Sequence, residues 1–467
     1  MTAKVFHAHL WGTREHKYAV LRESSIAETD WTELQPQSPF YLFVPRDTSF
    51  QDEYIEAPQL TDIVPLNGMG ITTARDHFVI DYDQQPLLER AHLFCDQALS
   101  DRDACDKVGI NLKKGWDVAD ARSSLRGITH LRALVEPVDY RPFDQRLILY
   151  HDAVVWRSVK QIMRHLMAGR NLALVTFRAI RELPWRHAFV ASEALVKEYI
   201  SSLDNCFAFP VYRYGTAKEL FDDDGPWTPD EGGRVPNLSV DFVAALGQQL
   251  GVSFVPDGVG DLAQTFGPED VFHYIYAVFH SPAYRERYAE FLKIDFPRVP
   301  LTADLDLFRS LCGLGADLVA LHLLEDDYPH ASWTKAGEPA PLADLVTSYP
   351  VAGDNTVEKG HPKYVPPGET PPGEDEPAEQ GRVYISRTRP RNGQRGQYFE
   401  GVPPEVWAFH IGGYQVCEKW LKDRRGRQLS YEDLTHYQRV VVALAETPRL
   451  MAEVDEAIEA HGGWPIE

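Results

Sequence analysis

Cysteine is scarce in this 467-residue sequence, and long apolar runs are absent from it. The cysteines form no CxxC pair, which argues against a zinc site or a disulfide framework and fits a reducing compartment, so we expect a cytoplasmic protein. No apolar run approaches the ~20 residues that a membrane-spanning helix needs. Residues 1–9 lack a basic region followed by an apolar block, so we expect no secretory signal. The five cysteines are Cys95, Cys105, Cys206, Cys312 and Cys417.

Motifs for the commonest enzyme chemistries are also missing. The sequence has no P-loop ending GK[ST], no GxGxxG fingerprint, no GxSxG elbow and no Asn/Asp-Pro-Pro-aromatic loop of an amino-methyltransferase, and no DExx box supports ATP hydrolysis. His151 and Asp152 form an isolated His-Asp pair without further metal ligands, so we interpret the pair as structural. We therefore expect no catalysis, no metal site and no cofactor in this chain. A cryptic metal-dependent nuclease is kept as an alternative, because the PD…ExK motif of such enzymes is very loose.

One stretch of the chain is rich in basic residues although the chain as a whole is strongly acidic. The chain carries 47 Lys and Arg against 69 Asp and Glu, a formal net charge of -22. The stretch from Tyr140 to His187 nevertheless holds nine basic residues and three acidic ones. Positive charge gathered in an acidic protein indicates a site for a phosphate-bearing partner, and ordinary solvated or ion-paired arginines are the alternative. The basic residues are Arg141, Arg146, Arg157, Lys160, Arg164, Arg170, Arg178, Arg181 and Arg186.

Short strands and helices alternate along the chain, which predicts an α+β or mixed α/β fold with a sheet-containing N-terminal part and a largely helical C-terminal part. The spacing of Phe272, Tyr276 and Phe279 is typical of a buried stripe on one helix. The expected strands are 40–44, 77–81, 172–177 and 207–212. The expected helices are 86–100, 153–168, one beginning at 239, 271–280, 281–293 and 304–324.

Composition divides the chain into five parts. We expect a connector at 1–60, a mixed α/β region at 61–235 and a helical region at 236–350. Residues 351–381 hold many prolines and almost no aliphatic side chains, so we expect a flexible linker rich in Pro, Gly and Glu. Residues 382–467 combine a basic hairpin, which turns at an Asn-Gly pair, with a helical C-terminal region.

A glycine-containing turn and a helix carry the first candidate binding residues. Glycines at 68 and 70 would allow a positive φ that places Thr72, Thr73 and Arg75 at a strand entrance. On the helix expected at 153–168, three cations fall on one face and would contact phosphates. These cations are Arg157, Lys160 and Arg164.

Two further basic groups lie near the C-terminus. The tip of the expected hairpin carries Arg389 and Arg391, which either protect an edge strand or touch phosphates. A second basic group, at 419–427, lies at the end of an expected helix. Cations there complement the helix dipole, so we interpret that group as structural.

Seven short motifs follow one another along the chain: Gly70–Asp76, Tyr140–Asp144 with Arg146 and Tyr150, Phe209–Tyr212, Pro236–Ser239, Glu269–Tyr276, Pro297–Leu301, and Trp407 through Gly412–Tyr414 to Glu418–Leu421. This series resembles the C-terminal target-recognition, or specificity, region of Type ISP single-polypeptide restriction–modification enzymes. The resemblance covers roughly residues 1–460 in the right order. The first motif also resembles the start of the recognition domain in related N6-adenine methyltransferases.

The resemblance implies a module that reads double-stranded DNA and positions it for an adenine methyltransferase. In that family one chain also carries the nuclease, the translocase and the methyltransferase, so S-adenosylmethionine, ATP and Mg²⁺ would belong to those modules. Residues 1–60 resemble the tail of the methyltransferase. The start at Met1 departs from the family pattern, which leaves a split subunit, a gene fragment or a mis-called start as alternatives.

The resemblance places Arg75, Arg141 and Arg146 near the duplex, with other cations on phosphates. For Arg141 and Arg146 the alternative is a buried ion pair with Asp144 or Asp76. A different class of function, an acidic subunit that docks on a partner methyltransferase, also fits the net charge.

Overall fold

The structure, a computed structural model, describes residues 3–111, 115–181, 184–215, 233–325, 334–335, 338–339, 354–387 and 396–466. The chain forms two units, Met1–Glu53 and Tyr54–Glu467. Within the described part of the chain, the search for a helix long and apolar enough to cross a bilayer found none.

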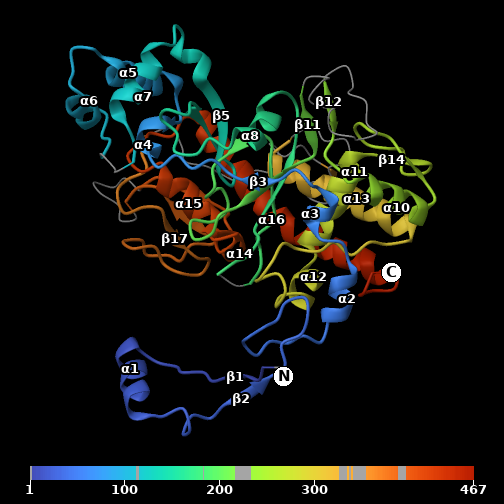
Figure 1. Cartoon of the computed structure of the whole chain (residues 1–467). Coiled ribbons are helices and arrows are strands. Elements are labelled where there is room, and N and C mark those ends of the chain that lie inside the picture. The colour runs from blue at the N-terminus through green and yellow to red at the C-terminus, as the bar shows by residue number, and fades with distance from the viewer. Residues whose placement is uncertain are drawn as a thin grey trace. The chain divides into compact units, whose positions relative to one another are not determined.

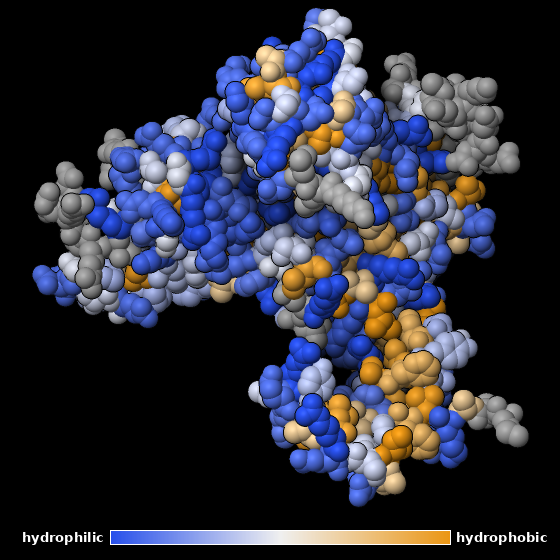
Figure 2. Space-filling model, turned by 60° about the vertical axis from the view of Figure 1, so that its left-hand side comes forward, coloured by the Kyte–Doolittle hydropathy of each residue, from blue (hydrophilic) through white to orange (hydrophobic). Residues whose placement is uncertain are grey.

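The first unit has secondary structure but no hydrophobic core among its described residues. Strand β1 (Val5–His7) pairs antiparallel with β2 (Thr32–Leu34), and α1 (Arg14–Glu23) lies between them in the sequence. No residue described between 3 and 50 is buried. Figure 2 shows orange, hydrophobic surface gathered on the lower lobe, which holds these elements. A two-stranded sheet without a hydrophobic face to cover it is marginal in water.

Two four-stranded sheets form the centre of the second unit (Figure 1). The first is antiparallel, in the order β3-β10-β7-β8. The second has the order β4-β6-β5-β9 and is antiparallel except for the β5–β9 pair. Their strands are β3 (Gly68–Met69), β10 (Phe207–Pro210), β7 (Ala173–Thr176), β8 (Phe189–Ala191), β4 (Ile80–Asp81), β6 (Asp144–Leu149), β5 (Val135–Arg141) and β9 (Ala194–Leu195).

The other described sheets of the second unit are smaller. They are β11 (Tyr212–Tyr214) with β12 (Arg234–Pro236), β13 (Ser253–Phe254) with β14 (Thr265–Phe266), β15 (Thr334–Lys335) with β16 (Glu338–Pro339), β17 (Lys363–Val365) with β18 (Arg382–Tyr384) and β19 (Tyr398–Glu400), and β20 (His410–Ile411) with β21 (Tyr414–Gln415).

The remaining helices are α2 (Gln51–Glu56), α3 (Leu60–Ile63), α4 (Asp76–Val79), α5 (Gln84–Cys95), α6 (Asp101–Lys107), α7 (Val118–Arg126), the 3-10 helix η1 (Leu131–Leu134), α8 (Lys160–Met167), α10 (Val240–Leu250), α11 (Pro268–His280), α12 (Pro282–Arg287), α13 (Leu305–Leu323), α14 (Pro404–Trp407), α15 (Val416–Asp423) and α16 (Tyr431–Ala460).

Helices α11, α13 and α16 pack against one another as the helical core. The aromatic stripe expected on α11 is confirmed, since Phe272, Tyr276 and Phe279 are all buried. A polar link crosses this core. The Tyr276 hydroxyl lies 2.6 Å from Nδ1 of His322 on α13, and Nε2 of His322 lies 3.0 Å from Oγ1 of Thr447 on α16. Buried polar groups must find partners, and these three satisfy one another across the helices.

The mixed α/β prediction is confirmed, and several expected elements match closely. Strand 172–177 corresponds to β7, and helix 304–324 to α13. Two other expected helices are shorter, since α5 ends at Cys95 and not at residue 100, and α12 ends at Arg287 and not at residue 293. Ser239 caps α10, because its hydroxyl accepts the Phe242 N–H at 3.4 Å. The two strands of the expected hairpin are present as the antiparallel pair β18 and β19, while its Asn-Gly turn lies outside the described residues.

Three further local predictions are wrong. Residues 40–44 form turns and irregular backbone with side chains half-buried or exposed, so the apolar run there has no sheet to join. Residues 76–79 form the single helical turn α4, which leaves only Ile80 and Asp81 to pair with β6. The helix expected at 153–168 begins only at Lys160, because Trp156 and Arg157 pair with the Thr72–Thr73 backbone and Val159 takes a φ of 51°.

The described part of the expected linker, 354–381, packs against the rest of the second unit. It contributes β17 to a three-stranded sheet and buries Val357, Val365 and Ala378. Few aliphatic side chains are present there, yet each of these three lies inside. The composition of this part does not reveal that it packs, because its packing depends on the pairing of β17 with β18.

Two glycines on α13 give a direct test of the helix packing. A methyl group on Gly315 would overlap the His273 carbonyl of α11, whereas Gly313 on the same helix has nothing within 4 Å. We expect Gly315→Ala to destabilise the protein by about 1–3 kcal/mol through overpacking. Gly313→Ala should stabilise it by about 0.5–1 kcal/mol, because alanine is the better helix former. Chemical denaturation of both variants checks this, and equal effects would contradict the close approach of α11 and α13.

Candidate functional site

The loop Gly70–Asp76 is fixed by contacts with three other segments. Neither Gly68 nor Gly70 has a positive φ, so that part of the prediction is wrong, and the positive φ of 59° belongs to Ala74. Gly70 is needed for another reason, because a side chain there would lie 2.6 Å from the backbone of Val196. The Thr73 hydroxyl donates to Asp76, which closes the loop.

This loop pairs with the segment that precedes α8. The Thr72 N–H donates to the Arg157 carbonyl at 3.0 Å, and the Arg157 N–H donates to the Thr72 carbonyl at 2.9 Å. Thr72 is half-buried, whereas Arg157, Lys160 and Arg164 are exposed. Trp156, beside Arg157, is 45% exposed. We call these five residues the Thr72–Arg164 surface.

The cations of the Thr72–Arg164 surface differ in their surroundings. Lys160 forms an exposed ion pair with Asp152 at 2.5 Å. Arg157 precedes α8, so only Lys160 and Arg164 lie one turn apart on the helix itself. The structure thus joins the loop that carries half-buried Thr72 to the segment that carries exposed Arg157, Lys160 and Arg164.

Arg75 and Thr73 lie beneath this surface and not on it. The Arg75 side chain is 4% exposed and Thr73 is 5% exposed. Burial lowers the pKa of Arg75, and its guanidinium forms no ion pair among the described residues. It lies instead 3.6 Å from the ring centroid of Trp116 and donates to the Val154 carbonyl at 3.1 Å. Arg75 therefore adds positive potential below the surface without reaching a bound partner directly.

Arg146 belongs to a buried ion cluster at the tip of the β5–β6 hairpin. Its guanidinium lies 2.7 Å from the Asp144 carboxylate, which is 2% exposed and also binds Arg424 of the C-terminal region at 2.9 Å. Asp423 lies 3.4 Å from Arg146. Burial alone would raise the pKa of Asp144, but the charges of Arg424 and Arg146 outweigh it and lower that pKa. The structure thus favours the ion-pair alternative for Arg146.

Arg141 packs against aromatic rings. Its guanidinium lies 4.1 Å from the Tyr140 centroid and 5.2 Å from that of Tyr414, and it donates to the Tyr140 carbonyl at 2.5 Å. Tyr140 in turn donates its hydroxyl to Asp76 at 2.8 Å. Of the two acids named for these arginines, Asp144 binds Arg146, and Asp76 binds Tyr140 and Thr73.

The remaining cations of the basic stretch are dispersed. Arg178 pairs with Asp295 at 3.2 Å, and Arg181 pairs with Asp204 at 3.2 Å. Arg170 lines a pocket. Arg389 and Arg391 lie outside the described residues. The basic residues of the Tyr140–His187 stretch thus lie at several places in the structure, and only Arg157, Lys160 and Arg164 belong to the Thr72–Arg164 surface.

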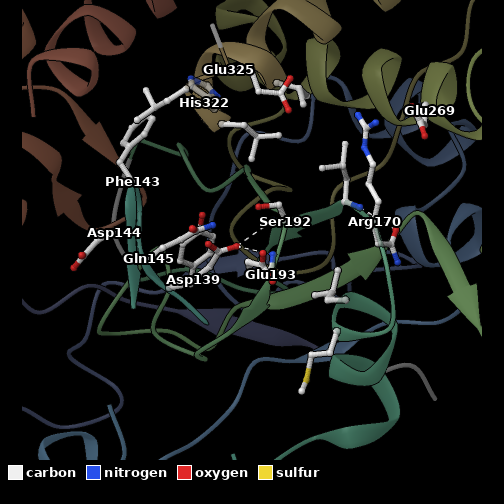
Figure 3. A pocket seen from close by; sticks show the side chains of 18 of the residues that line it. Asp139, Phe143, Asp144, Gln145, Arg170, Ser192, Glu193, Glu269, His322 and Glu325 are labelled. Atoms are coloured by element: carbon white, nitrogen blue, oxygen red, sulfur yellow. Dashed lines mark hydrogen bonds between the residues drawn. The ribbon is translucent and has the colours of Figure 1, made fainter. Parts of the chain in front are cut away.

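A pocket of about 860 Å³ lies between the β5–β6 hairpin, the β8–β9 turn and helices α11, α13 and α16 (Figure 3). The Asp139 carboxylate accepts the backbone N–H groups of Ser192 and Glu193, each at 3.0 Å. Glu269 and Glu325 lie on the far side, near Arg170. Carboxylates therefore outnumber cations around this space.

Burial controls protonation in the pocket. It raises the pKa of Asp139 to about 6, and it raises the pKa of Glu193 to about 7 with help from the charge of Asp139. Burial lowers the pKa of His322 to about 3 and that of His273 to about 4, so both rings are neutral at pH 7. No cluster of metal-ligand side chains was found among the described residues. An acidic pocket with neutral histidines repels phosphate, so the cationic surface is the better candidate for a polyanion.

Three residues of the surface and the pocket, Trp156, Asp139 and Glu193, were not predicted from the sequence. Trp156 stands next to Arg157, and an aromatic residue inside a basic stretch was the signal that could have singled it out. Asp139 and Glu193 are 54 residues apart along the chain, and nothing in the local sequence indicates that they meet. Arg424 was interpreted as structural, and its contact with Asp144 agrees with that interpretation, although the partner is a carboxylate and not the helix dipole.

The family model of the Type ISP C-terminal specificity domain matches residues 62–453. No curated protein matches the chain. Two solved structures of Type ISP restriction–modification enzymes have a similar fold. One is a nuclease-deletion mutant of LlaGI in complex with a DNA substrate mimic, with a TM-score of 0.61 and 17% identity. The other is the ATP-dependent LlaBIII bound to DNA, with a TM-score of 0.62 and 13% identity.

A third similar structure is a DrdV–DNA complex, with a TM-score of 0.58 and 17% identity. The matches cover 96% of this chain for LlaGI, 94% for DrdV and 94% for LlaBIII. They cover only 33%, 42% and 27% of those proteins, respectively. The chain thus spans less than half the length of each of them.

The ion cluster yields a prediction about stability. We expect Asp144→Asn to destabilise the protein by about 3–5 kcal/mol, because Arg146 and Arg424 would remain buried without their carboxylate. Asp152→Asn removes an exposed pair and should cost less than about 1 kcal/mol. Urea denaturation of both variants measures the difference. Equal costs would contradict a buried anchoring role for Asp144.

The same cluster has a defined pH dependence. The folded-state pKa of Asp144 is lowered, so its stabilisation is present above the unfolded value of about 4 and is lost as the pH falls through the folded value. The difference in unfolding free energy between wild type and Asp144→Asn should therefore shrink below about pH 4. A difference that grew on acidification would contradict this sign.

Proposed function

The chain belongs to the family of Type ISP C-terminal specificity domains, and we propose that it recognises a DNA sequence as part of a restriction–modification enzyme. The observation that carries the proposal is the match of the family model over residues 62–453. The fold shared with LlaGI, LlaBIII and DrdV, each solved with DNA or a substrate mimic, supports it. Recognition positions the duplex for adenine-N6 methylation, and the chemistry belongs to other modules.

The Thr72–Arg164 surface is the proposed contact with the duplex. Its exposed cations lie in an acidic protein, where only a local positive region attracts phosphates. The backbone pairing of Thr72 with Arg157 holds the loop and α8 together, so these cations are presented from a rigid base. Arg157, Lys160 and Arg164 would fix the register on phosphates, while base edges are read by side chains that come close once the duplex is seated.

The partners in the proposal are a methyltransferase and a translocase–nuclease, which would bind S-adenosylmethionine, ATP and Mg²⁺. The first unit supplies the surface for the methyltransferase. It exposes large apolar side chains, among them Trp11 at 74%, Ile26 at 82% and Phe43 at 63%. The β1–β2 pair also leaves strand edges open. Such a segment becomes stable when another module covers its apolar side chains and extends its sheet.

Duplex binding tests the DNA proposal. We expect binding to a mixed-sequence duplex pool with a steep dependence on salt and enrichment of one motif. Arg157→Gln should weaken binding to all sequences alike and lower the salt slope by about 0.9, because one phosphate contact is lost. Arg309→Gln, an exposed arginine on α13, is the matched control and should change nothing. If the free chain shows no affinity for any duplex, the alternative of an acidic docking subunit is supported instead.

Association with a separately produced methyltransferase module tests the first unit. We expect Trp11→Ser and Phe43→Ser each to weaken that association at least tenfold, because burial of a large apolar side chain contributes about 1.5–3 kcal/mol. Leu203→Ser is a control, since Leu203 is an exposed apolar residue of the second unit. Affinity measured by titration calorimetry should be unchanged in the control. Unchanged affinity in all three variants would contradict the proposed surface.

A further inference from the structure

A stack of planar side chains runs from the core to the Thr72–Arg164 surface. The ring of Phe94, which is fully buried, stacks on Trp116 with 6.0 Å between centroids and 10° between planes. The Arg75 guanidinium lies 3.6 Å from the centroid of Trp116 and 5.9 Å from that of Trp156. Arg75 thus packs on Trp116 and also lies within cation–π range of Trp156, whose side chain is in part open to solvent.

Hydrogen bonds hold this stack in place. The Trp116 Nε1–H donates to the Ala153 carbonyl at 2.8 Å, and Arg75 donates to the neighbouring Val154 carbonyl at 3.1 Å. The Trp156 N–H donates to the Thr73 carbonyl at 3.3 Å. The turn that carries Trp156 is therefore tied both to the stack beneath it and to the Gly70–Asp76 loop. An aromatic side chain on such a fixed base loses little conformational freedom when it binds a partner.

The surroundings of Trp156 indicate what it would bind. Most exposed apolar side chains need no explanation, but a tryptophan beside exposed Arg157 combines a flat apolar face with positive charge. Lys160 adds a second exposed cation, whose pair with Asp152 is also exposed and therefore weak. Arg75 adds a guanidinium below Trp156 that no carboxylate neutralises among the described residues. Positive charge that follows a sugar–phosphate chain, together with a ring on which a base can stack, is the usual arrangement for bases exposed from a duplex.

We propose that Trp156 stacks on a DNA base that has lost a stacking neighbour. The inference rests on the proposed function, because a methyltransferase must take its adenine out of the duplex, which uncovers the faces of the adjacent bases. Trp156 would cover one such face while Arg157 and Lys160 hold the neighbouring phosphates. Stacking of one base on an aromatic side chain is worth on the order of 5- to 150-fold in affinity.

Equilibrium binding of the full chain to two duplex pools tests the proposal. One pool is intact, and the other carries a single abasic nucleotide, which exposes the faces of its neighbours. We expect the wild type to prefer the abasic pool and Trp156→Ala to lose that preference by roughly 5- to 150-fold. Trp156→Phe should keep most of it. Tyr431→Ala, which removes an aromatic residue that is 69% exposed at the start of α16, should behave as the wild type.

The salt dependence separates stacking from other roles. Stacking contributes no counterion release, so the salt slope of Trp156→Ala should equal that of the wild type. An equal loss of affinity for both pools, a wild type without preference, or a preference retained by Trp156→Ala would each overturn the stacking role while leaving DNA recognition intact. Absence of wild-type binding to either pool would overturn the proposed function and the stacking role together.

Discussion

The buried carboxylate of Asp144 is the constraint on which the second unit depends. It joins two arginines from segments about 280 residues apart. Directly before it, Phe143 has a φ of 58°, and its carbonyl accepts Trp420 Nε1 at 3.1 Å and lies 2.7 Å from His436 Nε2. The hairpin tip is thereby held against α15 and α16. Tyr140, on the same hairpin, holds Asp76 and with it the Gly70–Asp76 loop, so the ion cluster and the proposed binding surface belong to one connected framework.

The folded chain also separates acidic from basic side chains that are interspersed in the sequence. Asp139 and Glu193 meet in a pocket where burial raises both pKa values, whereas Arg157, Lys160 and Arg164 remain on the outside. An acidic protein can bind a polyanion only where the local potential is positive, and an exposed pair such as Lys160–Asp152 costs little to break. Local arrangement, and not net charge, therefore decides where a duplex could bind.

Much of the fold could be predicted from the sequence because its signals are local. The apolar spacing of α11, the cap at Ser239 and the strands β18 and β19 each depend on a few neighbouring residues. The helix before Lys160 could not be excluded, since its loss depends on backbone pairing with Thr72, about 85 residues earlier in the sequence. The same limit applies to the candidate site. Arg157 and Arg164 are exposed as expected, but the burial of Arg75 and Arg146 follows from Trp116, Asp144 and Arg424, which only the folded chain brings to them.

Photo-cross-linking most directly tests the claim that the Thr72–Arg164 surface contacts DNA. A photoreactive amino acid would replace Arg157 in one version of the chain and Arg309 in another, each mixed with labelled duplex at a salt concentration that permits binding. The account predicts a cross-link to DNA from position 157 and none from position 309. A bound duplex that cross-links from position 309 and not from position 157 would contradict it.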